Sequence, residues 1–556
     1  MPNFLENIFA QLARSSDHMV LREVRGEEFV SVAGKELLAN IAQIRAYLRS
    51  AGLQPGDRCA LLAPNSILWA AFDLALMAEG VIVVPLYSRQ SPAELVAMLR
   101  DCQPRYLFTS DAALGDAVVQ GWPGAPQRVL FEEALQAKLP PVTPAPIPRA
   151  ASDLVTILYT SGTSGEPKGV CLNVGNINHM LGCTGERLDQ LMGHPPAADP
   201  DRVFHYLPFS FAGSWILLLT CLARVSELAL STDLTRLVDE ISLAAPNYFL
   251  NVPTLLERVR RGVEEAMAKR SAPIRALFQR AALAWQRQHV GRGAGSDKLW
   301  LALGRKFIFG KIKARFGSHL RALICGSAPL APETQQFFLM LGIPVLQVYG
   351  LTETTAICTM DDPGIPVEPG YVGPAISGIE MKVGENDEIL VRGPNIFPGY
   401  WNRPTDTARV LRDGWLHSGD QGEVNIRGNW RISGRIKNLI VLNSGHNIPP
   451  EPIEEKIAQR LPAAQQAVLV GDGRGYLCAL ITGSPAPKDV QAALDAINPD
   501  LPHYRQIRNF HVLREVFTPE NGLLTANGKL RRDAINARYA AEVNAMYDVR
   551  AAQKPS

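Results

Sequence analysis

The segment from Tyr159 to Gly169, YTSGTSGEPKG, concentrates chemical groups that can bind an anion. Its small and polar residues include Thr160, Ser161, Gly162, Thr163, Ser164, Gly165 and Lys168. Glycines let backbone N–H groups approach an anion closely, hydroxyls donate further hydrogen bonds, and a lysine supplies a point charge. The glycine spacing does not fit the Walker pattern of P-loop NTPases. The segment predicts a loop that binds a polyphosphate, with an ordinary flexible turn as the alternative.

Two later segments carry groups suited to the rest of a nucleotide. In VYGLTETTA (348–356), Tyr349, Thr352 and Glu353 lie close together in sequence. An aromatic face can stack on a purine, a hydroxyl can bond to a phosphate, and a carboxylate can hold Mg²⁺. GWLHSGD (414–420) ends at Asp420, whose two oxygens can accept hydrogen bonds from a ribose diol. Taken singly, Asp420 is equally well explained as a residue that caps a turn.

Basic residues mark two further segments near the C-terminus. Arg435 and Lys437 precede an apolar run in ISGRIKNLIVLNSGHN (432–447), and Lys529 follows an Asn-Gly turn signal in LLTANGKLRRD (523–533). Each has a structural alternative, because Arg435 also fits a surface ion pair and Lys529 is one of 56 lysines and arginines.

Length and composition describe a folded protein with more than one domain. The chain has 556 residues, 47% of them hydrophobic and 20% charged. The net charge of +2 gives no reason to expect binding to nucleic acid. The eight cysteines form no CxxC pair, and the N-terminal residues lack the pattern of a signal peptide. We therefore expect reduced thiols and a cytoplasmic protein.

The elements that must position these motifs follow from local patterns. Residues 32–53 have helical apolar spacing that ends at Gly52, and residues 91–103 form a second helix with Ser91 and Glu94 as a capping box. Short apolar runs at 58–64, 80–87 and 104–110 have the character of buried strands. This β-α-β order predicts a mostly parallel sheet covered by helices.

Further along, the pattern changes. Residues 372–432 are rich in strand signals, and the last part of the chain mixes strands at 467–471 and 476–482 with helices at 449–461 and 486–497. That mixture predicts a small, separate C-terminal domain.

Taken together and in this order, the five motifs resemble those of the adenylate-forming superfamily, which contains acyl-CoA synthetases, adenylation domains and firefly-type luciferases. The resemblance extends from about residue 30 to 535. It implies an α/β multi-domain fold. A large N-terminal lobe (1–434) would hold two layered α/β subdomains and a small β-barrel-like subdomain. A small mobile α+β C-terminal domain (435–556) would follow.

The resemblance also implies roles for the residues. ATP or AMP would be bound by the loop residues above, by Gly326, Ser327 and Ala328 in CGSAPL, and by Tyr349, Gly350, Thr352, Asp420 and Arg435. Lys168, Thr352, Glu353 and Lys529 would be catalytic, and Lys437 would be the hinge. Glu353, with Thr160 as a second candidate, would bind Mg²⁺. ATP and CoA would be co-substrates.

The acid substrate is indicated less directly. The helical stretch before ALICGSAPL (322–330) and the segment 445–459 resemble long-chain acyl-CoA synthetases. An apolar tunnel lined from FSFAGSWILLLT (209–220) would house the acyl tail, and a plain core helix is the alternative for that segment. The leading hypothesis is a medium- to long-chain fatty acid–CoA ligase that forms AMP. An acyl-AMP ligase that loads a carrier protein, or an inactive nucleotide-binding regulator, remains an alternative.

Several positions depart from the family pattern. Phe211 stands where a histidine is frequent, Asn438 where an acid is frequent, and Ser418 where threonine is usual. Val441 replaces a lysine that some members use in the thiol step, so that role does not transfer to this chain.

One segment is strongly basic. Residues 257–315 contain 15 Lys and Arg against four Asp and Glu, a surplus of 15 − 4 = +11. A solvated helical surface explains this surplus, and so does a face that contacts an anionic membrane. The second explanation would place a cytoplasmic protein peripherally on the inner membrane face.

Overall fold

Two mixed sheets form the large lobe of the protein. The computed structural model describes residues 3–120, 122, 124–137, 139–140, 142, 145–161, 167–193, 199–289, 291–525 and 528–547. In the first sheet the strand order is β17-β8-β7-β4-β3-β5-β6. Its strands are β17 (Gly399–Tyr400), β8 (Pro167–Asn173), β7 (Leu154–Ser161), β4 (Ile82–Leu86), β3 (Arg58–Leu62), β5 (Tyr106–Thr109) and β6 (Gln127–Leu130).

The second sheet has the order β14-β13-β12-β11-β9-β10-β1-β2. Its strands are β14 (Thr359–Met360), β13 (Val345–Tyr349), β12 (Ala322–Cys325), β11 (Tyr248–Asn251), β9 (Arg202–His205), β10 (Glu227–Leu230), β1 (Met19–Arg25) and β2 (Glu28–Ala33). The pairs from β13 to β1 are parallel, and both edge pairs are antiparallel. In the first sheet the pairs from β7 to β6 are parallel, and β8 pairs antiparallel with both β7 and β17. The predicted mostly parallel sheet is therefore confirmed.

Helices cover both sheets and begin where the sequence indicated. α2 (Gly34–Ser50) and α4 (Pro92–Cys102) confirm the two predicted helices, and the Ser91 hydroxyl caps α4 by accepting from the Glu94 N–H at 3.4 Å. The other helices around the sheets are α1 (Phe4–Arg14), α3 (Ile67–Ala78), α5 (Ala112–Val119), α6 (Phe131–Gln136), α7 (Val174–Met192), α8 (Ala212–Arg224), α9 (Leu237–Ala244) and α14 (Pro332–Met340).

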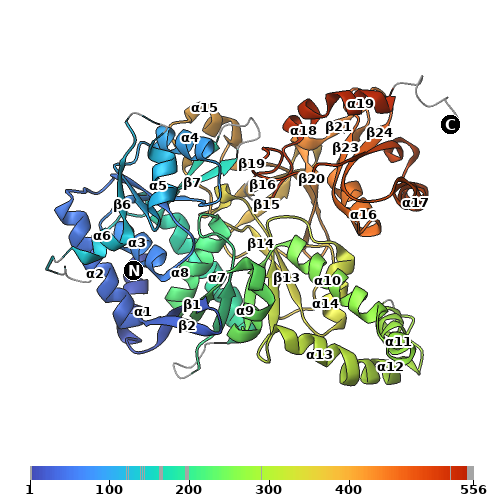
Figure 1. Ribbon diagram of the computed structural model, residues 1–556, viewed down its shortest axis with the longest axis horizontal. Helices are drawn as coiled ribbons and strands as arrows, with labels where there is room; N and C mark the ends of the chain where they lie inside the picture. The colour runs from blue at the N-terminus through green and yellow to red at the C-terminus, as the bar shows by residue number, and fades with distance from the viewer. Residues whose placement is uncertain are drawn as a thin grey trace.

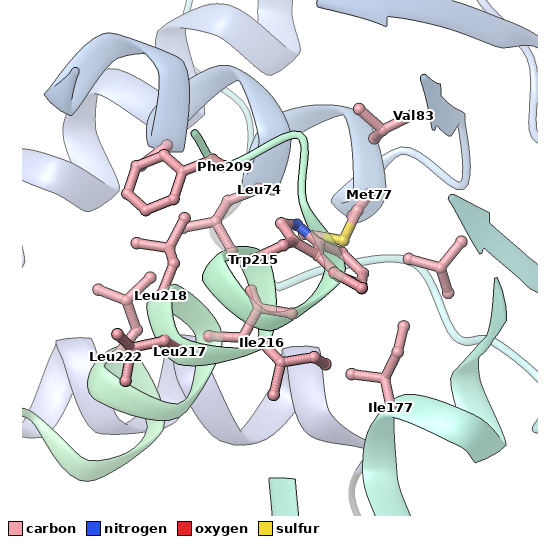
Figure 2. Close-up of a cluster of buried hydrophobic side chains, with 14 of the residues drawn as sticks. Leu74, Met77, Val83, Ile177, Phe209, Trp215, Ile216, Leu217, Leu218 and Leu222 are labelled. Atoms are coloured by element: carbon pink, nitrogen blue, oxygen red, sulfur yellow. The ribbon is translucent and has the colours of Figure 1, made fainter. Parts of the chain in front are cut away.

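The core of the lobe is built around α3 and α8, which are apolar on almost every side. Figure 2 shows Trp215 of α8 beside Met77 of α3, with Leu218 and Leu222 further along the helix. The Trp215 indole donates a 2.8 Å hydrogen bond to Asp73, a fully buried acid on α3. All eight cysteines are buried and free, as predicted for reduced thiols.

The strand-rich stretch forms a third, antiparallel sheet. It consists of β15 (Glu380–Val383), β16 (Glu388–Arg392), β18 (Leu411–Arg412), β19 (Trp415–Val424) and β20 (Trp430–Arg435). Among the described strands the path β15-β16-β19-β18 stays open, so this subdomain is a sheet rather than a closed barrel. The short helix α15 (Pro404–Val410) lies between β17 and β18.

The C-terminal domain has its own cores and its own sheets. One sheet has three strands, β23 (Ala464–Val470), β24 (Leu477–Gly483) and β25 (Ile507–Leu513). A second, two-stranded sheet consists of β21 (Ile440–Val441) and β22 (Asn447–Ile448). Four helices accompany them, α16 (Glu451–Arg460), α17 (Pro487–Ile497), α18 (Arg532–Arg538) and α19 (Ala540–Tyr547). Two apolar clusters contain buried residues from this part of the chain alone. Figure 1 shows it as the red unit at one side of the large lobe.

The basic segment forms a helical arm at the edge of the large lobe. It is built from α10 (Pro253–Ala268), α11 (Ala272–His289), α12 (Asp297–Gly304) and α13 (Gly310–Lys313). In Figure 1, α11 and α12 lie at the periphery, away from the sheets. Within the part of the chain that the structure describes, every helix is too short or too polar to cross a bilayer.

Candidate active site

One cavity of about 2340 Å³ lies between the large lobe and the C-terminal domain. Its wall brings together residues that are far apart in sequence, among them Thr160, Lys168, Glu353, Arg435, Lys437 and Lys529. It therefore collects groups from every predicted motif into a single space.

The described ends of the anion-binding segment lie in two paired antiparallel strands, β7 and β8. β7 and β8 pair so that Thr160 lies opposite Lys168 and Ser161 opposite Pro167. The predicted contacts at Gly162, Thr163, Ser164 and Gly165 lie outside the described residues. The pairing of the two strands places Lys168 on the cavity wall.

Lys168 is held by residues that the motifs did not indicate. Its ammonium is 3.2 Å from an oxygen of Asp406, in the first turn of α15, and 5.4 Å from the ring centroid of Tyr400. The hydroxyl of Tyr400 in turn donates a 2.7 Å hydrogen bond to Glu353. Tyr400 thus connects the lysine of one motif to the carboxylate of another.

Glu353 and Thr352 are presented by a tight turn after β13. At Gly350 an added Cβ would lie 2.2 Å from the carbonyl oxygen of Ala356, so the turn leaves room only for glycine. The next turn (Thr352–Thr354) is held by the Thr354 hydroxyl, which accepts from the Leu351 N–H at 2.8 Å. Both Thr352 and Glu353 reach the cavity wall.

Asp420 lies behind this wall and is almost fully buried. It pairs in register with Arg435, whose Nε is 2.7 Å from Oδ1, and the Ser418 hydroxyl accepts a hydrogen bond from its N–H at 3.0 Å. The hydroxyl of Tyr349 donates to Oδ2 at 2.8 Å. Burial raises the pKa of Asp420, and the charge of Arg435 opposes that rise. Burial and then the charge of Asp420 raise the pKa of Tyr349 well above its usual value.

Lys529 enters the cavity from the C-terminal domain. Its N–H donates to the Thr525 hydroxyl at 3.1 Å and its carbonyl accepts from the Thr525 N–H at 2.8 Å, while Leu524 pairs with Leu530. Desolvation and then the charge of Arg435 lower the pKa of Lys529, whereas the charges of Asp420 and Glu353 oppose that shift. The lysine therefore faces the acidic residues of the large lobe.

Lys437 stands where the chain passes from β20 into the C-terminal domain. It belongs to the turn Ile436–Asn438 and lines the cavity. Burial, followed by the charge of Arg435, lowers the pKa of Lys437 to about 8. The side chain of Asn438 donates a 2.6 Å hydrogen bond to Glu451 of α16.

The segment CGSAPL reaches the cavity only in part. Gly326 and Ser327 line it, and Ser327 has a φ of +73° that few residues other than glycine adopt. Ala328 is exposed, and the cavity wall does not include it.

An apolar branch of the same cavity runs between α7 and α8. Ile216, Leu217 and Thr220 of α8 line it, whereas Trp215 and Leu218 do not. Figure 2 shows Trp215, Ile216, Leu217 and Leu218 together in one buried cluster. α7 contributes Thr184 and Leu188, and the Thr184 and Thr220 hydroxyls are 2.9 Å apart. At the cavity wall Phe211 packs against Tyr87 with ring centroids 5.7 Å apart. One face of α8 thus lines the cavity and the other packs into the core, and an acyl tail beside the first face remains a prediction.

Sequence reasoning missed Tyr400, Asp406 and Arg531. Tyr400 and Asp406 lie in the segment PGYWNRPTDT (398–407). The two adjacent aromatic residues in this segment, which follow a glycine and precede a proline, were the sequence feature that could have indicated a site residue. Arg531, two residues after Lys529, forms an ion pair with Glu94 of the large lobe.

Comparisons with known proteins agree with this arrangement. A family model described as AMP-binding enzyme matches residues 8–401, and one described as AMP-binding enzyme C-terminal domain matches residues 437–551. The long-chain-fatty-acid--CoA ligase FadD15 of Mycobacterium bovis is 27% identical over 594 residues, which cover 98% of this chain and 97% of the relative. The putative fatty-acid--CoA ligase fadD11 of Mycobacterium tuberculosis is 30% identical over 442 residues, which cover 71% of this chain and 74% of the relative.

A solved structure shares the whole fold. The o-succinylbenzoate CoA synthetase MenE of Bacillus subtilis, in complex with the acyl-adenylate OSB-AMP, superposes with a TM-score of 0.76 at 20% identity. The match covers 96% of this chain and 98% of that one.

Proposed function

The chain belongs to the AMP-binding enzyme family, and from this premise we propose that it joins a medium- or long-chain fatty acid first to AMP and then to coenzyme A. The observation that carries the proposal is that residues of both domains line one shared cavity. Lys168, Glu353 and Arg435 of the large lobe and Lys529 of the C-terminal domain line it, and an apolar branch opens from the same space.

In the first step an oxygen of the fatty acid carboxylate attacks the α-phosphorus of ATP. A new P–O bond forms, the bond to pyrophosphate breaks, and an acyl-adenylate remains. The catalytic requirements are positioning and neutralisation of charge. Lys168 and the other residues of the anion-binding segment would bind the β- and γ-phosphates, Thr352 the α-phosphate, and Lys529 the oxygens of carboxylate and nucleotide.

The remaining nucleotide contacts follow from the same arrangement. Tyr349, Gly350, Gly326 and Ser327 would surround adenine, and Asp420 with Arg435 would hold the ribose. Glu353 would hold Mg²⁺ with Thr160 as a second oxygen ligand, because carboxylate and hydroxyl oxygens suit this ion. When bound, Mg²⁺ would neutralise phosphate charge.

In the second step the thiol of coenzyme A attacks the acyl carbon. The thioester bond forms, AMP leaves, and the thiol proton is released. We place the domain boundary between residues 434 and 435 and the hinge at Lys437, so that the C-terminal domain withdraws Lys529 before this step. Lys437 lies at the point where the cavity wall continues into that domain.

The apolar branch supports an acyl chain as the substrate. Leu188, Ile216 and Leu217 line it, and each CH₂ buried there contributes about 0.8 kcal/mol. Relatives named as long-chain fatty acid–CoA ligases cover nearly the full chain, which supports the same substrate class.

The proposal is tested by assaying purified protein with Mg²⁺, ATP and a panel of fatty acids. We expect acid-dependent release of pyrophosphate, an acyl-adenylate trapped as a hydroxamate by hydroxylamine, and acyl-CoA when coenzyme A is added. Acylation of a pantetheinylated carrier protein but not of free coenzyme A would identify an acyl-AMP ligase instead. No pyrophosphate with any acid, but measurable ATP binding, would identify a regulator.

We also propose that the basic arm (residues 257–315) rests on anionic membranes, from which fatty acids are drawn. Four large apolar side chains are exposed on the described part of the arm, Ile274 at 40%, Leu283 at 53%, Leu299 at 59% and Phe307 at 50%. The last two directly follow Lys298 and Lys306 in the sequence. Exposed apolar groups flanked by cations favour the interface of an anionic bilayer.

Sedimentation with vesicles that contain phosphatidylglycerol tests this contact. We expect binding at low salt that weakens with added salt and with the double change Leu299→Ser and Phe307→Ser. The matched control is Ile426→Ser, since Ile426 is exposed in the turn between β19 and β20, outside the basic arm. Absence of binding at low salt would refute the contact and leave the enzymatic proposal intact.

A further inference from the structure

Arg531 and Arg532, which follow Lys529 closely in sequence, form ion pairs with residues of different domains. Arg531 forms an ion pair with Glu94 of α4 in the large lobe. Arg532 bonds to both oxygens of Glu454 in its own domain, at 2.7 and 2.6 Å. The first contact thus crosses the cavity between the domains, and the second stays within one domain.

The backbone explains why these neighbours diverge. Successive side chains of an extended segment alternate in direction, so Lys529 and Arg531 share one side and Leu530 the other. Leu530 packs against the buried cluster of the C-terminal domain and reaches the cavity wall at its edge, and Lys529 and Arg531 also line the cavity. Arg531 therefore meets the large lobe on the same side as the lysine that would act there.

Glu94 offers Arg531 a rigid partner. It lies in the first turn of α4, where its backbone N–H donates to the Ser91 hydroxyl. The same helix is tied to β7, because Tyr159 donates a 2.6 Å hydrogen bond to Asp101. Thr160 of β7 pairs with Lys168 of β8. The Arg531–Glu94 contact therefore fixes the position of Lys529 relative to the strand that carries the anion-binding segment.

We propose that Arg531 and Glu94 are a positioning pair that seats Lys529 for adenylation and separates before the thioester step. The inference rests on the proposed function. Both side chains are about a quarter exposed, 27% and 28%, so the contact forms and breaks without a large desolvation cost. Neither residue touches the reacting atoms, and their effect would pass through the placement of Lys529.

Comparison of the two half-reactions tests the proposal. Arg531→Ala and Glu94→Gln should each slow acid-dependent ATP–pyrophosphate exchange roughly tenfold, since a small misplacement of a catalytic group is costly. Both should leave thioester formation from supplied acyl-adenylate unchanged. The double variant should be no slower than either single one, and Arg531→Lys should retain most of the exchange rate.

The chain offers matched controls. Arg538→Ala removes an ion pair of 2.8 Å to Glu515 inside the C-terminal domain and should leave both half-reactions unchanged. Arg532→Ala breaks the intradomain contact with Glu454 and should slow both together. If Arg531→Ala also slowed both half-reactions equally, or slowed neither, or if its effect added to that of Glu94→Gln, the positioning role would be wrong.

A second measurement needs no turnover. All native cysteines are buried, so cysteines introduced at the exposed Ala113 and Lys488 can be spin-labelled selectively. We expect one dominant distance in the otherwise native protein and a loss of that population in Arg531→Ala. An unchanged distribution would overturn the inference even if the enzyme proved active, whereas a loss of that population in a protein without adenylation activity would refute only the proposed function.

Discussion

The hydroxyl of Tyr349 donates a 2.8 Å hydrogen bond to Oδ2 of Asp420, while Oδ1 of the same carboxylate lies 2.7 Å from Arg435. Both oxygens of this buried acid are therefore engaged by protein groups. A ribose diol would share or replace the tyrosine contact, because that donor is neutral and Arg435 is charged.

This arrangement separates two substitutions. Asp420→Asn should raise the KM for ATP roughly tenfold or more, because it removes the charged acceptor of the ribose. Tyr349→Phe keeps the ring beside adenine and loses only the hydroxyl, so we expect the KM for ATP to change by less than roughly threefold. Initial-rate kinetics check both, and an equal effect of the two changes would contradict this assignment.

Loss of the Lys529 ammonium should separate the two half-reactions. Lys529→Ala is expected to slow adenylation roughly 10²–10³-fold, as removal of one charge-stabilising donor does elsewhere. Thioester formation from supplied acyl-adenylate should continue. Single-turnover assays of each step provide the measurement, and an equal loss in both would count against the role of Lys529.

Tyr400 should influence the reaction through Glu353. Tyr400→Phe removes the hydrogen bond to that carboxylate and leaves the ring beside Lys168 in place. We expect about a tenfold fall in kcat/KM for ATP, which corresponds to about 1.4 kcal/mol. A titration of Mg²⁺ should show that the variant needs a higher Mg²⁺ concentration for half-maximal activity. An unaltered Mg²⁺ dependence would show that Tyr400 does not influence Mg²⁺ binding.

The two faces of α8 should respond differently to mutation. Leu217→Trp fills the apolar branch, and loss of room for two methylene groups costs about 1.6 kcal/mol, roughly a 15-fold fall in kcat/KM for the longest acids. Leu218→Ala on the core face should lower the stability by about 2–5 kcal/mol without altering chain-length preference. Acids of graded length, together with thermal denaturation, distinguish the two outcomes.

Asp73 should make the stability depend on pH. Burial raises its pKa to about 7, so folding favours the protonated acid, and the resulting stabilisation is lost as the pH rises from about 4 through 7. Asp73→Asn keeps an acceptor for Trp215 and carries no charge. Its free energy of unfolding, measured by chemical denaturation, should exceed that of the native protein increasingly between pH 5 and pH 7, by on the order of 1–3 kcal/mol at the upper end. A difference independent of pH would show that Asp73 does not titrate there.

Local signals predicted the elements well. α2 and α4 follow from apolar spacing and from Ser91 at the cap, and these depend on neighbours in sequence. The motif residues Lys168, Glu353, Arg435 and Lys529 do line one cavity. That convergence was expected from the family resemblance, because composition and spacing contain no information on contacts between distant segments.

The supporting contacts were beyond the reach of sequence reasoning for the same reason. Nothing in the sequence around Asp406 distinguishes it from the other acidic residues of the chain. Arg531 is separated from its partner Glu94 by 437 residues, so local patterns do not indicate their contact. The helix α8 shows a further limit, since an apolar segment does not reveal which of its faces will meet a cavity and which the core. The open path of the third sheet likewise depends on tertiary pairing rather than on strand propensity.

Because α8 supplies both the central core and the wall of the apolar branch, substitutions in α8 that change the substrate range should also change how well this protein folds. A variant library that reshapes the branch will also sample folding yield, so selection for a new acid will enrich compensating changes in α3 and α7. Substitutions in those two helices are therefore expected to accompany a change of acid specificity before any substitution near the nucleotide.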